Sequence, residues 1–360
     1  MHQQVTKLDF TGQDIFVGLD VGTKSWKISI MTEMLEHKTF SQPPKVDVLV
    51  KYLYRNFPGG RYHCVYEAGY CGYWIHDELR QYEIDCIVVN PADVPTKHKE
   101  HANKTNRVDA RKLCRNLRNG ELDAIYVPTR PSLEDRSLVR SRYHFVKKQT
   151  RCKNQIKALL NFYGIPVPED VETRHWSGRF ISWLQQITFQ RQSGDQALKS
   201  FLEELLYLRQ IIARLTKQIR TLATEDRYRM SVVYLKSVHG VSTLSAMILL
   251  TELIDIHRFR TLDHLASYCG LVPGEHSTGE EQTITGISRR RNPQLRALLV
   301  ECAWVAVRTD PALLMAFSKL STQMPKNKAI IRIARKLLNR IRFVLNNQQP
   351  YQPCIVQSSR

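Results

Sequence analysis

Hydrophobic and polar positions in the first third of the chain alternate between strand-like and helix-like spacing. The run "IFVGLDVGT" at 15–23 has the apolar, β-favouring residues of a buried strand. Further segments follow in chain order: strands at 26–31 and 35–40, a helix at 46–57, a strand at 61–69, a helix at 73–82, a strand at 84–91 and a helix at 107–120. Three early strands followed by alternating helices and strands predict an α/β domain with a mixed sheet over residues 14–125.

The next region, 130–228, is predicted to be helical and elongated. Seven Lys and Arg and no acidic residue lie between Val139 and Leu160, which predicts a basic helix face. An apolar stripe then alternates steps of four and three residues: Phe201, Leu205, Leu208, Ile212, Leu215, Ile219 and Leu222. This is the a/d pattern of a coiled coil over three heptads, and a core helix of a local bundle gives the same pattern. An intermolecular seam would make the chain a homodimer or tetramer.

The third region is predicted to be mostly helical over 229–345, with a tail at 346–360. Near its start a short helix, a turn at Gly240 and an apolar helix resemble a helix-hairpin-helix, whose turn amides hold a DNA phosphate. Ser242 replaces the second glycine that is usual in such a turn. Residues 270–292 are rich in Gly, Ser and Thr and end in three arginines, which predicts a loop.

The charge of the chain narrows the classes of partner. The 360 residues carry 53 Lys and Arg against 34 Asp and Glu, a formal net charge of +19. Such a surface attracts polyanions, of which nucleic acid is the commonest. Between Lys319 and Arg342 eight Lys and Arg stand without an acidic residue, and phosphate contacts would explain that bias.

Membrane and zinc-binding classes are disfavoured. No apolar run approaches the roughly 18 residues that a membrane-spanning helix needs, and the first ten residues lack the apolar core of a signal peptide. We therefore expect a cytoplasmic protein without a membrane partner. The eight cysteines form no Cys-x-x-Cys pair and, with the histidines, no zinc-finger spacing, so any metal is expected to have oxygen ligands.

Three carboxylates stand where they could share metal ions. Asp20 ends the first strand, and Glu67 ends the strand "CVYEAG" in the same arrangement of apolar strand, carboxylate and glycine. Asp109 lies at the start of a predicted helix whose apolar face would pack on the sheet. Such a cluster repels itself unless divalent cations neutralise it, and Mg²⁺ or Mn²⁺ is the expected cofactor of phosphodiester chemistry. Each residue alone has a simpler role: a turn, an ion pair or a helix N-terminus.

The order of these motifs resembles one known family. "GLDVGTKSWKISI", "YEAGYCGYWIHDEL", "VVNPADVPTKHK" and "KTNRVDARKL" follow one another as in the DEDD-type transposases of the "IS-one-ten" insertion-sequence family, relatives of the Piv DNA invertase. "YCGLVPGEHSTGEE" and "GISRRRNPQLRALLVECAW" are similar to the C-terminal transposase domain of that family. The resemblance covers nearly all of residues 14–345.

The resemblance implies a fold and an activity. It implies a ribonuclease-H-like (RuvC-like) N-terminal domain, a helical coiled-coil insertion and a C-terminal domain with a nucleophilic serine. The family excises and inserts its element by recombination, guided by a structured RNA that the element encodes and that pairs with donor and target DNA. The basic residues expected to contact these backbones are Lys147, Lys148, Arg151, Arg289, Arg290, Arg291, Arg296, Lys326, Lys328, Arg335 and Lys336.

The resemblance also implies which residues form the site, and this chain departs from the family pattern at two positions. Asp20, Glu67 and Asp109 are expected to hold the metal, and Asn106 stands where the family usually has a second aspartate. Asparagine offers a neutral oxygen, so metal affinity should fall. The glycine usual in the "K-x-G-N" stretch is Arg291.

The nucleophile is expected in "HSTGEE". In the family pattern it commonly stands immediately before the glycine, which is Thr278 here, whereas Ser277 is the less hindered alcohol. Ser277 is favoured by a narrow margin, and Thr278 remains the alternative.

Two alternatives to an active RNA-guided recombinase remain at this stage. One is a relative weakened by Asn106 that binds nucleic acid without cutting it. The other is a RuvC-like nuclease that hydrolyses DNA with metal-activated water and uses the C-terminal domain only to hold DNA.

Overall fold

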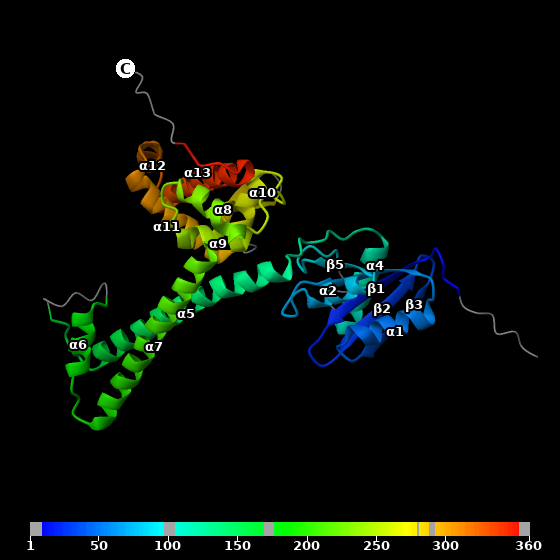
Figure 1. The fold of residues 1–360 in the computed structure, drawn as a ribbon, viewed down its shortest axis with the longest axis horizontal. Helices are drawn as coiled ribbons and strands as arrows, with labels where there is room; N and C mark the ends of the chain where they lie inside the picture. Colours follow the sequence, from blue (N-terminus) through cyan, green and yellow to red (C-terminus); the bar gives the residue numbers. More distant parts are fainter. Residues whose placement is uncertain (1–8, 97–104, 169–175, 279–280, 288–291, 353–360) are drawn as a thin grey trace, which may run out of the picture. The chain divides into compact units, whose positions relative to one another are not determined.

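A computed structural model describes residues 9–96, 105–168, 176–278, 281–287 and 292–352, without the side chains of 273–291. The chain divides into two compact units, Met1–Val127 and Pro128–Arg360, drawn in Figure 1. None of the helices described is long and apolar enough to cross a membrane.

The first unit is built on a five-stranded mixed sheet with the order β3-β2-β1-β4-β5. β1 pairs antiparallel with β2, β2 pairs antiparallel with β3, and β1, β4 and β5 are parallel. The strands are β1 (Asp14–Val21), β2 (Trp26–Thr32), β3 (Glu36–Gln42), β4 (Arg61–Glu67) and β5 (Asp85–Val89). The mixed sheet predicted from the hydrophobic pattern is therefore confirmed.

Helices cover both faces of this sheet. On one face, α1 (Val46–Asn56) and α2 (Trp74–Gln81) pack on a core that includes Ile15, Val17 and Leu19. On the other face lies α4 (Asn106–Arg118), whose Leu113 packs with Val65 of β4 and Val89 of β5. Because successive strand residues point to opposite faces, β1 contributes Ile15, Val17 and Leu19 to the first core and turns Gly18 toward α4.

The second unit begins with a long helical hairpin. Helices α5 (Arg130–Phe162) and α7 (Gln192–Leu222) pack side by side, with the short α6 (Gly178–Gln186) at one end (Figure 1). Cys152, Ile156 and Leu160 of α5 are buried against Leu198, Leu202, Leu205 and Leu208 of α7. The hairpin satisfies the expectation of an elongated helical region.

The apolar stripe of α7 is covered largely within the chain. Leu205, Leu208, Ile219 and Leu222 are buried by other helices of this unit, whereas Phe201, Ile212 and Leu215 are half-buried. Intramolecular burial thus accounts for most of the heptad-like spacing, as the local-bundle alternative expects. The stripe alone gives no argument for self-association, and the homodimer or tetramer remains a prediction.

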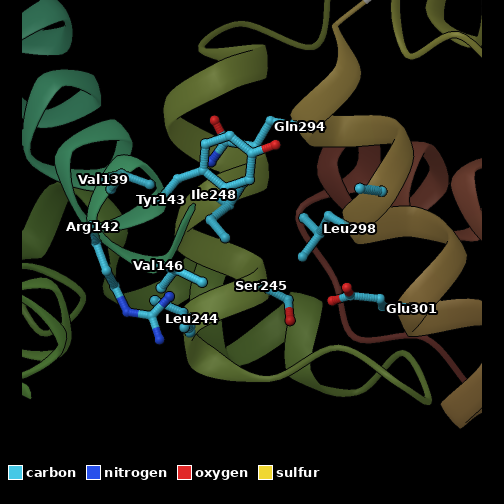
Figure 2. A pocket seen from close by; sticks show the side chains of 11 residues that line it. Val139, Arg142, Tyr143, Val146, Leu244, Ser245, Ile248, Gln294, Leu298 and Glu301 are labelled. Carbon is cyan, nitrogen blue, oxygen red and sulfur yellow. The ribbon is translucent and has the colours of Figure 1, made fainter. Parts of the chain in front are cut away.

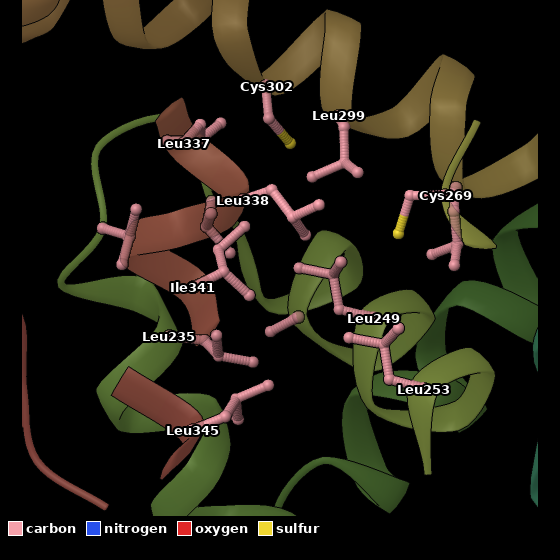
Figure 3. Packing of buried hydrophobic residues seen from close by; sticks show 14 of the residues in the cluster. Leu235, Leu249, Leu253, Cys269, Leu299, Cys302, Leu337, Leu338, Ile341 and Leu345 are labelled. Atoms are coloured by element: carbon pink, nitrogen blue, oxygen red, sulfur yellow. The ribbon is translucent and has the colours of Figure 1, made fainter. Parts of the chain in front are cut away.

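The remaining helices form one apolar core, shown in Figure 3, where Leu249, Leu299 and Leu338 point toward one another. They are α8 (Asp226–Lys236), α9 (Thr243–Leu253), α10 (Leu262–Tyr268), α11 (Pro293–Thr309), α12 (Pro311–Gln323) and α13 (Lys326–Asn347). Gly240, between α8 and α9, has a φ of +88°, and a Cβ there would lie 2.3 Å from the carbonyl oxygen of Cys302. Packing against α11 therefore requires glycine at this turn. Ser242 caps α9, its side chain accepting the N–H of Ser245 at 3.2 Å.

The loop predicted over 270–292 is partly wrong. Within it, β6 (Pro273–Thr278) and β7 (Glu281–Ile287) form an antiparallel ribbon. Gly, Ser and Thr are interpreted as loop formers, but "QTITGI" contains three consecutive β-branched residues, Thr283, Ile284 and Thr285, which favour an extended backbone. Pairing between the two strands then satisfies the main-chain N–H and C=O groups that face the partner strand.

Candidate functional site

Two of the predicted carboxylates lie at one edge of the sheet. β1 and β4 are parallel neighbours, and the last pair in register is Leu19 with Tyr66. Asp20 and Glu67 each stand one residue further along, so they are adjacent at the carboxyl ends of these strands. Gly18 and Val65 are paired in register and lie on the α4 face, and Asp20 and Glu67 stand two residues after them. Alternation along the strand therefore directs both carboxylates to that face.

Gly18 lets the third carboxylate come close. A Cβ on Gly18 would lie 2.2 Å from the carbonyl oxygen of Ala110 and 2.5 Å from the amide nitrogen of Cys114. The main chain of α4 thus rests directly on β1. Asp109 is in the first turn of α4, where Thr105 caps the helix by accepting the N–H of Val108 at 3.3 Å. The close packing brings the start of α4 to the edge that carries Asp20 and Glu67.

A buried lysine joins two of these carboxylates. Lys112 is 7 % exposed, and its Nζ lies 3.2 Å from Oδ1 of Asp109 and 3.5 Å from Oε1 of Glu67. Burial of an ammonium group is costly unless the charge is paired. The two carboxylates on opposite sides of Lys112 supply that pairing, so a cation occupies the space between Glu67 and Asp109.

The predicted metal ligands are only partly gathered. Among the residues that the structure describes, no three His, Cys, Asp or Glu side chains form a group that could hold a metal ion. Glu67 and Asp109 meet around Lys112, and Asn106 is exposed at the first position of α4. The ammonium group of Lys112 shows that one positive charge fits between carboxylate oxygens of Glu67 and Asp109, and oxygen is the type of ligand that Mg²⁺ prefers.

The predicted nucleophiles lie on the β6–β7 ribbon. Ser277 pairs in register with Gln282, and Thr278 pairs with Glu281, the last pair of the ribbon. Their side chains are outside the described residues. The chain is tied down on both sides of the ribbon, because the N–H of Asn292 donates to the carbonyl of Tyr268 at 3.0 Å and Arg296 donates to the carbonyl of Gly270.

A buried ion pair supports the base of this ribbon. Glu252 of α9 is fully buried and accepts two hydrogen bonds from Arg140 of α5, at 2.6 and 2.8 Å, and one from Nδ2 of Asn292 at 2.7 Å. Burial by itself raises the pKa of Glu252, but the hydrogen bonds and charge of Arg140 outweigh it and lower this pKa. Asn292 also caps α11 by accepting the N–H groups of Gln294 and Leu295, so one network joins α5, α9 and α11.

The predicted nucleic-acid contacts fall into three groups. Several are exposed lysines and arginines on two helices: Lys147, Lys148 and Arg151 on α5, and Lys326, Lys328 and Lys336 on α13. Two others make contacts within the protein: Arg335 forms an ion pair with Asp263, and Arg296 donates a hydrogen bond to the carbonyl of Gly270. Arg289, Arg290 and Arg291 lie outside the described residues. The exposed groups keep the bias toward positive charge that the sequence showed.

Sequence reasoning missed a basic hollow on α4. A pocket of about 530 Å³ is lined by Arg111, Arg115 and Arg118, with Glu36 and Met31 across from them. The spacing of four and three residues, which places the arginines on one side of the helix, could have revealed it. Sequence reasoning also missed Lys112, because nothing in the spacing distinguishes a buried lysine from a solvated one.

The second unit contains a further cavity between α5, α9 and α11. It has a volume of about 310 Å³, and its polar lining comes from Arg142, Tyr143, Ser245, Gln294 and Glu301 (Figure 2). Nε of Arg142 donates to Oγ1 of Thr216 at 2.7 Å. Burial, and then the charge of Arg220, lowers the pKa of Arg142. The cavity lies between helices and contains none of the predicted catalytic residues.

Comparison with known proteins connects the two units with one group of enzymes. A family model described as a DEDD transposase of the IS110 type matches residues 17–165, and one described as "Transposase IS116/IS110/IS902 family" matches residues 233–318. A DEDD transposase domain implies a ribonuclease-H-like fold, in agreement with the mixed sheet.

Individual relatives agree with the family models. The y4qE protein of Sinorhizobium fredii, a transposase by its name, is 36% identical over 243 residues, which cover 68% of this chain and 58% of the relative. The y4rJ protein of the same organism, also named a transposase, is 27% identical over 90% of each chain. The transposase of insertion sequence element IS1111A from Coxiella burnetii is 27% identical over 70% of this chain and 69% of its own.

Proposed function

Since the chain belongs to the IS110 family of DEDD transposases, we propose that it moves an insertion sequence by cutting and rejoining DNA. The observation that carries this proposal is the pairing of Glu67 and Asp109 across a single cation-sized space at the carboxyl end of β4. Carboxylates held this way at a sheet edge suit metal-assisted phosphodiester chemistry.

The acidic residues have the binding role in this proposal. Asp20, Glu67 and Asp109 would hold Mg²⁺ or Mn²⁺, and Asn106 would add a neutral oxygen from the first turn of α4. When bound, the metal supplies positive charge that stabilises a phosphate as its bonds change. Gly18 contributes by letting α4 approach β1, and the N-cap at Thr105 fixes the first turn that presents Asp109.

The nucleophile in this proposal is the hydroxyl of Ser277, with Thr278 as the alternative. Its oxygen forms a bond to a DNA phosphorus while the bond from phosphorus to the leaving strand breaks. The proton that the hydroxyl loses balances the one that the leaving oxygen gains. The resulting phosphoester conserves the bond energy for rejoining. The network of Glu252, Arg140 and Asn292 supports the ribbon on which both hydroxyls lie.

The partners in this proposal are donor and target DNA, a structured guide RNA from the element and further copies of this chain. The exposed basic residues of α5 and α13 support contacts with nucleic-acid backbones, since such contacts are mostly made by Lys and Arg. Three arginines along α4 add a basic hollow on the helix that carries Asp109.

A supercoiled plasmid assay with the guide RNA tests the proposal. Rejoined products that disappear in excess EDTA, and in Asp20→Ala, are expected. Cut ends without attached protein would favour a metal-dependent nuclease, and binding without chemistry would favour a silent nucleic-acid-binding relative, the alternative that Asn106 supports.

The covalent step has its own test. The DNA adduct is trapped and mapped by peptide mass spectrometry in Ser277→Ala, Thr278→Ala and the double variant. Loss of the adduct in Ser277→Ala alone is expected. An adduct that survives in the double variant would exclude a nucleophile in this ribbon.

A further inference from the structure

Lys112 is an unusual residue for its position. Its side chain is nearly fully buried under the edge of the sheet, one helical turn from Asp109, and its Nζ lies within 3.5 Å of both Glu67 and Asp109. The neighbouring residues of α4 show two other roles: Arg111 is exposed and pairs with Glu36, and Leu113 packs in the apolar core. Lys112 belongs to neither group, because its charged end faces two carboxylates.

We propose that Lys112 is an internal counter-cation that holds Glu67 and Asp109 together in the metal-free protein and gives way when a divalent cation binds. The proposal rests on the proposed function, in which these two carboxylates are metal ligands. Without a cation between them, two partly buried carboxylates would repel each other. A lysine satisfies them through a compact ammonium group on a flexible stem, which can withdraw more easily than a planar guanidinium.

The charge of the site fits this role. Glu67 and Asp109 carry two negative charges, and Lys112 between them reduces the formal charge of the three side chains to −1. The ammonium group therefore offsets the repulsion between the two carboxylates. A divalent cation between Glu67 and Asp109 would lie against the ammonium group, and like charges at that distance repel. Metal and Lys112 therefore compete for the same oxygens.

The site also leaves a path for this exchange. The side chain of Glu67 is 31% exposed and that of Asp109 is 17% exposed, so a hydrated ion can reach both carboxylates from solvent. The side chain of Lys112 is 8% exposed, so in this proposal its ammonium group withdraws from the two carboxylates as the ion enters.

The test is to measure Mn²⁺ affinity by titration calorimetry in the full-length protein and in Lys112→Met, which has a similar length and no charge. Removing the competitor is expected to tighten Mn²⁺ binding at least tenfold. The melting temperature of the metal-free variant should fall, and saturating Mn²⁺ should raise it by more than in the unmodified protein, because only the metal then neutralises the carboxylates.

Three controls make the outcome decisive. Arg111→Met removes an adjacent exposed charge and should leave Mn²⁺ affinity within twofold. Lys112→Gln keeps a hydrogen-bond donor, so it tests the same expectation if Lys112→Met does not fold. Unchanged or weaker Mn²⁺ binding in both Lys112 variants would overturn the proposal while leaving the metal site intact. Mn²⁺ binding that is absent, or indifferent to Asp109→Asn, would instead remove the metal site itself and the proposal with it.

Discussion

Replacing Gly18 with alanine tests how the metal site is assembled. The new Cβ would lie 2.2 Å from the carbonyl oxygen of Ala110 and 2.5 Å from the amide nitrogen of Cys114, both main-chain atoms of α4. Real carbon atoms do not approach that closely, and no side-chain rotation can relieve a contact with the main chain. The helix must therefore move away from β1, and Asp109 with it.

The size of the effect follows from the packing. Overpacking a core usually costs about 1–3 kcal/mol, and a contact with main-chain atoms belongs at the upper end of that range. A loss of about 3 kcal/mol lowers amide protection in a cooperative unit by about two orders of magnitude, since 1.4 kcal/mol is a factor of ten. Because Asp109 moves with the helix, Mn²⁺ binding should weaken as well.

Hydrogen exchange read by mass spectrometry on peptides from β1 and α4 measures this loss in the full chain. Gly69→Ala is the matched control: it lies two residues after Glu67 near the same sheet edge, and the nearest atom to its new Cβ is 4.0 Å away. It should leave protection unchanged. Wild-type protection and Mn²⁺ affinity in Gly18→Ala would show that α4 does not depend on this contact, and the proposed assembly of the site would be wrong.

Three further predictions concern other parts of the chain. Glu252→Gln should cost about 2 kcal/mol at pH 7, because Arg140 loses a buried charged partner. The pKa of Glu252 is lowered in the folded protein, so this stabilisation is present above the ordinary value of 4.5 and is lost as pH falls through the folded pKa. Urea unfolding from pH 7 to pH 3 should therefore show the difference in unfolding free energy between the two proteins shrinking, and a constant difference would contradict the ion-pair explanation. Leu208→Glu should expose the α5–α7 hairpin to proteolysis, whereas Tyr207→Glu, at an exposed neighbouring position, should not. If light scattering shows that the unmodified protein is an oligomer and that Leu208→Glu is a folded monomer, the stripe is intermolecular. Asn106→Asp should leave recombination equal or raise it at low Mg²⁺, because it restores an anionic ligand, and a large loss in the plasmid assay would assign Asn106 another role.

The sequence by itself predicted the elements of the first unit and the position of Asp20 and Glu67 at the ends of two strands. The apolar, β-favouring runs in "IFVGLDV" and "CVYEAG" predict two buried strands, and a carboxylate at the end of each then lies at the sheet edge. Residue spacing carries this information because side-chain direction repeats every two residues in a strand and every 3.6 in a helix. The order of the motifs predicted membership of the IS110 transposase family, and the comparisons confirmed it.

Tertiary structure decided what those patterns leave open. The stripe of α7 has the same spacing whether another chain or α5 covers it, and only the hairpin shows that α5 and its neighbours bury most of it. Lys112 reads as one more solvated lysine on a basic helix, and Gly18 reads as an ordinary strand residue. Both acquire their roles from residues distant in sequence: Lys112 from Glu67 on β4, and Gly18 from Ala110 and Cys114 on α4. Periodicity records which way a side chain points along its own element, whereas burial and pairing depend on what packs against it.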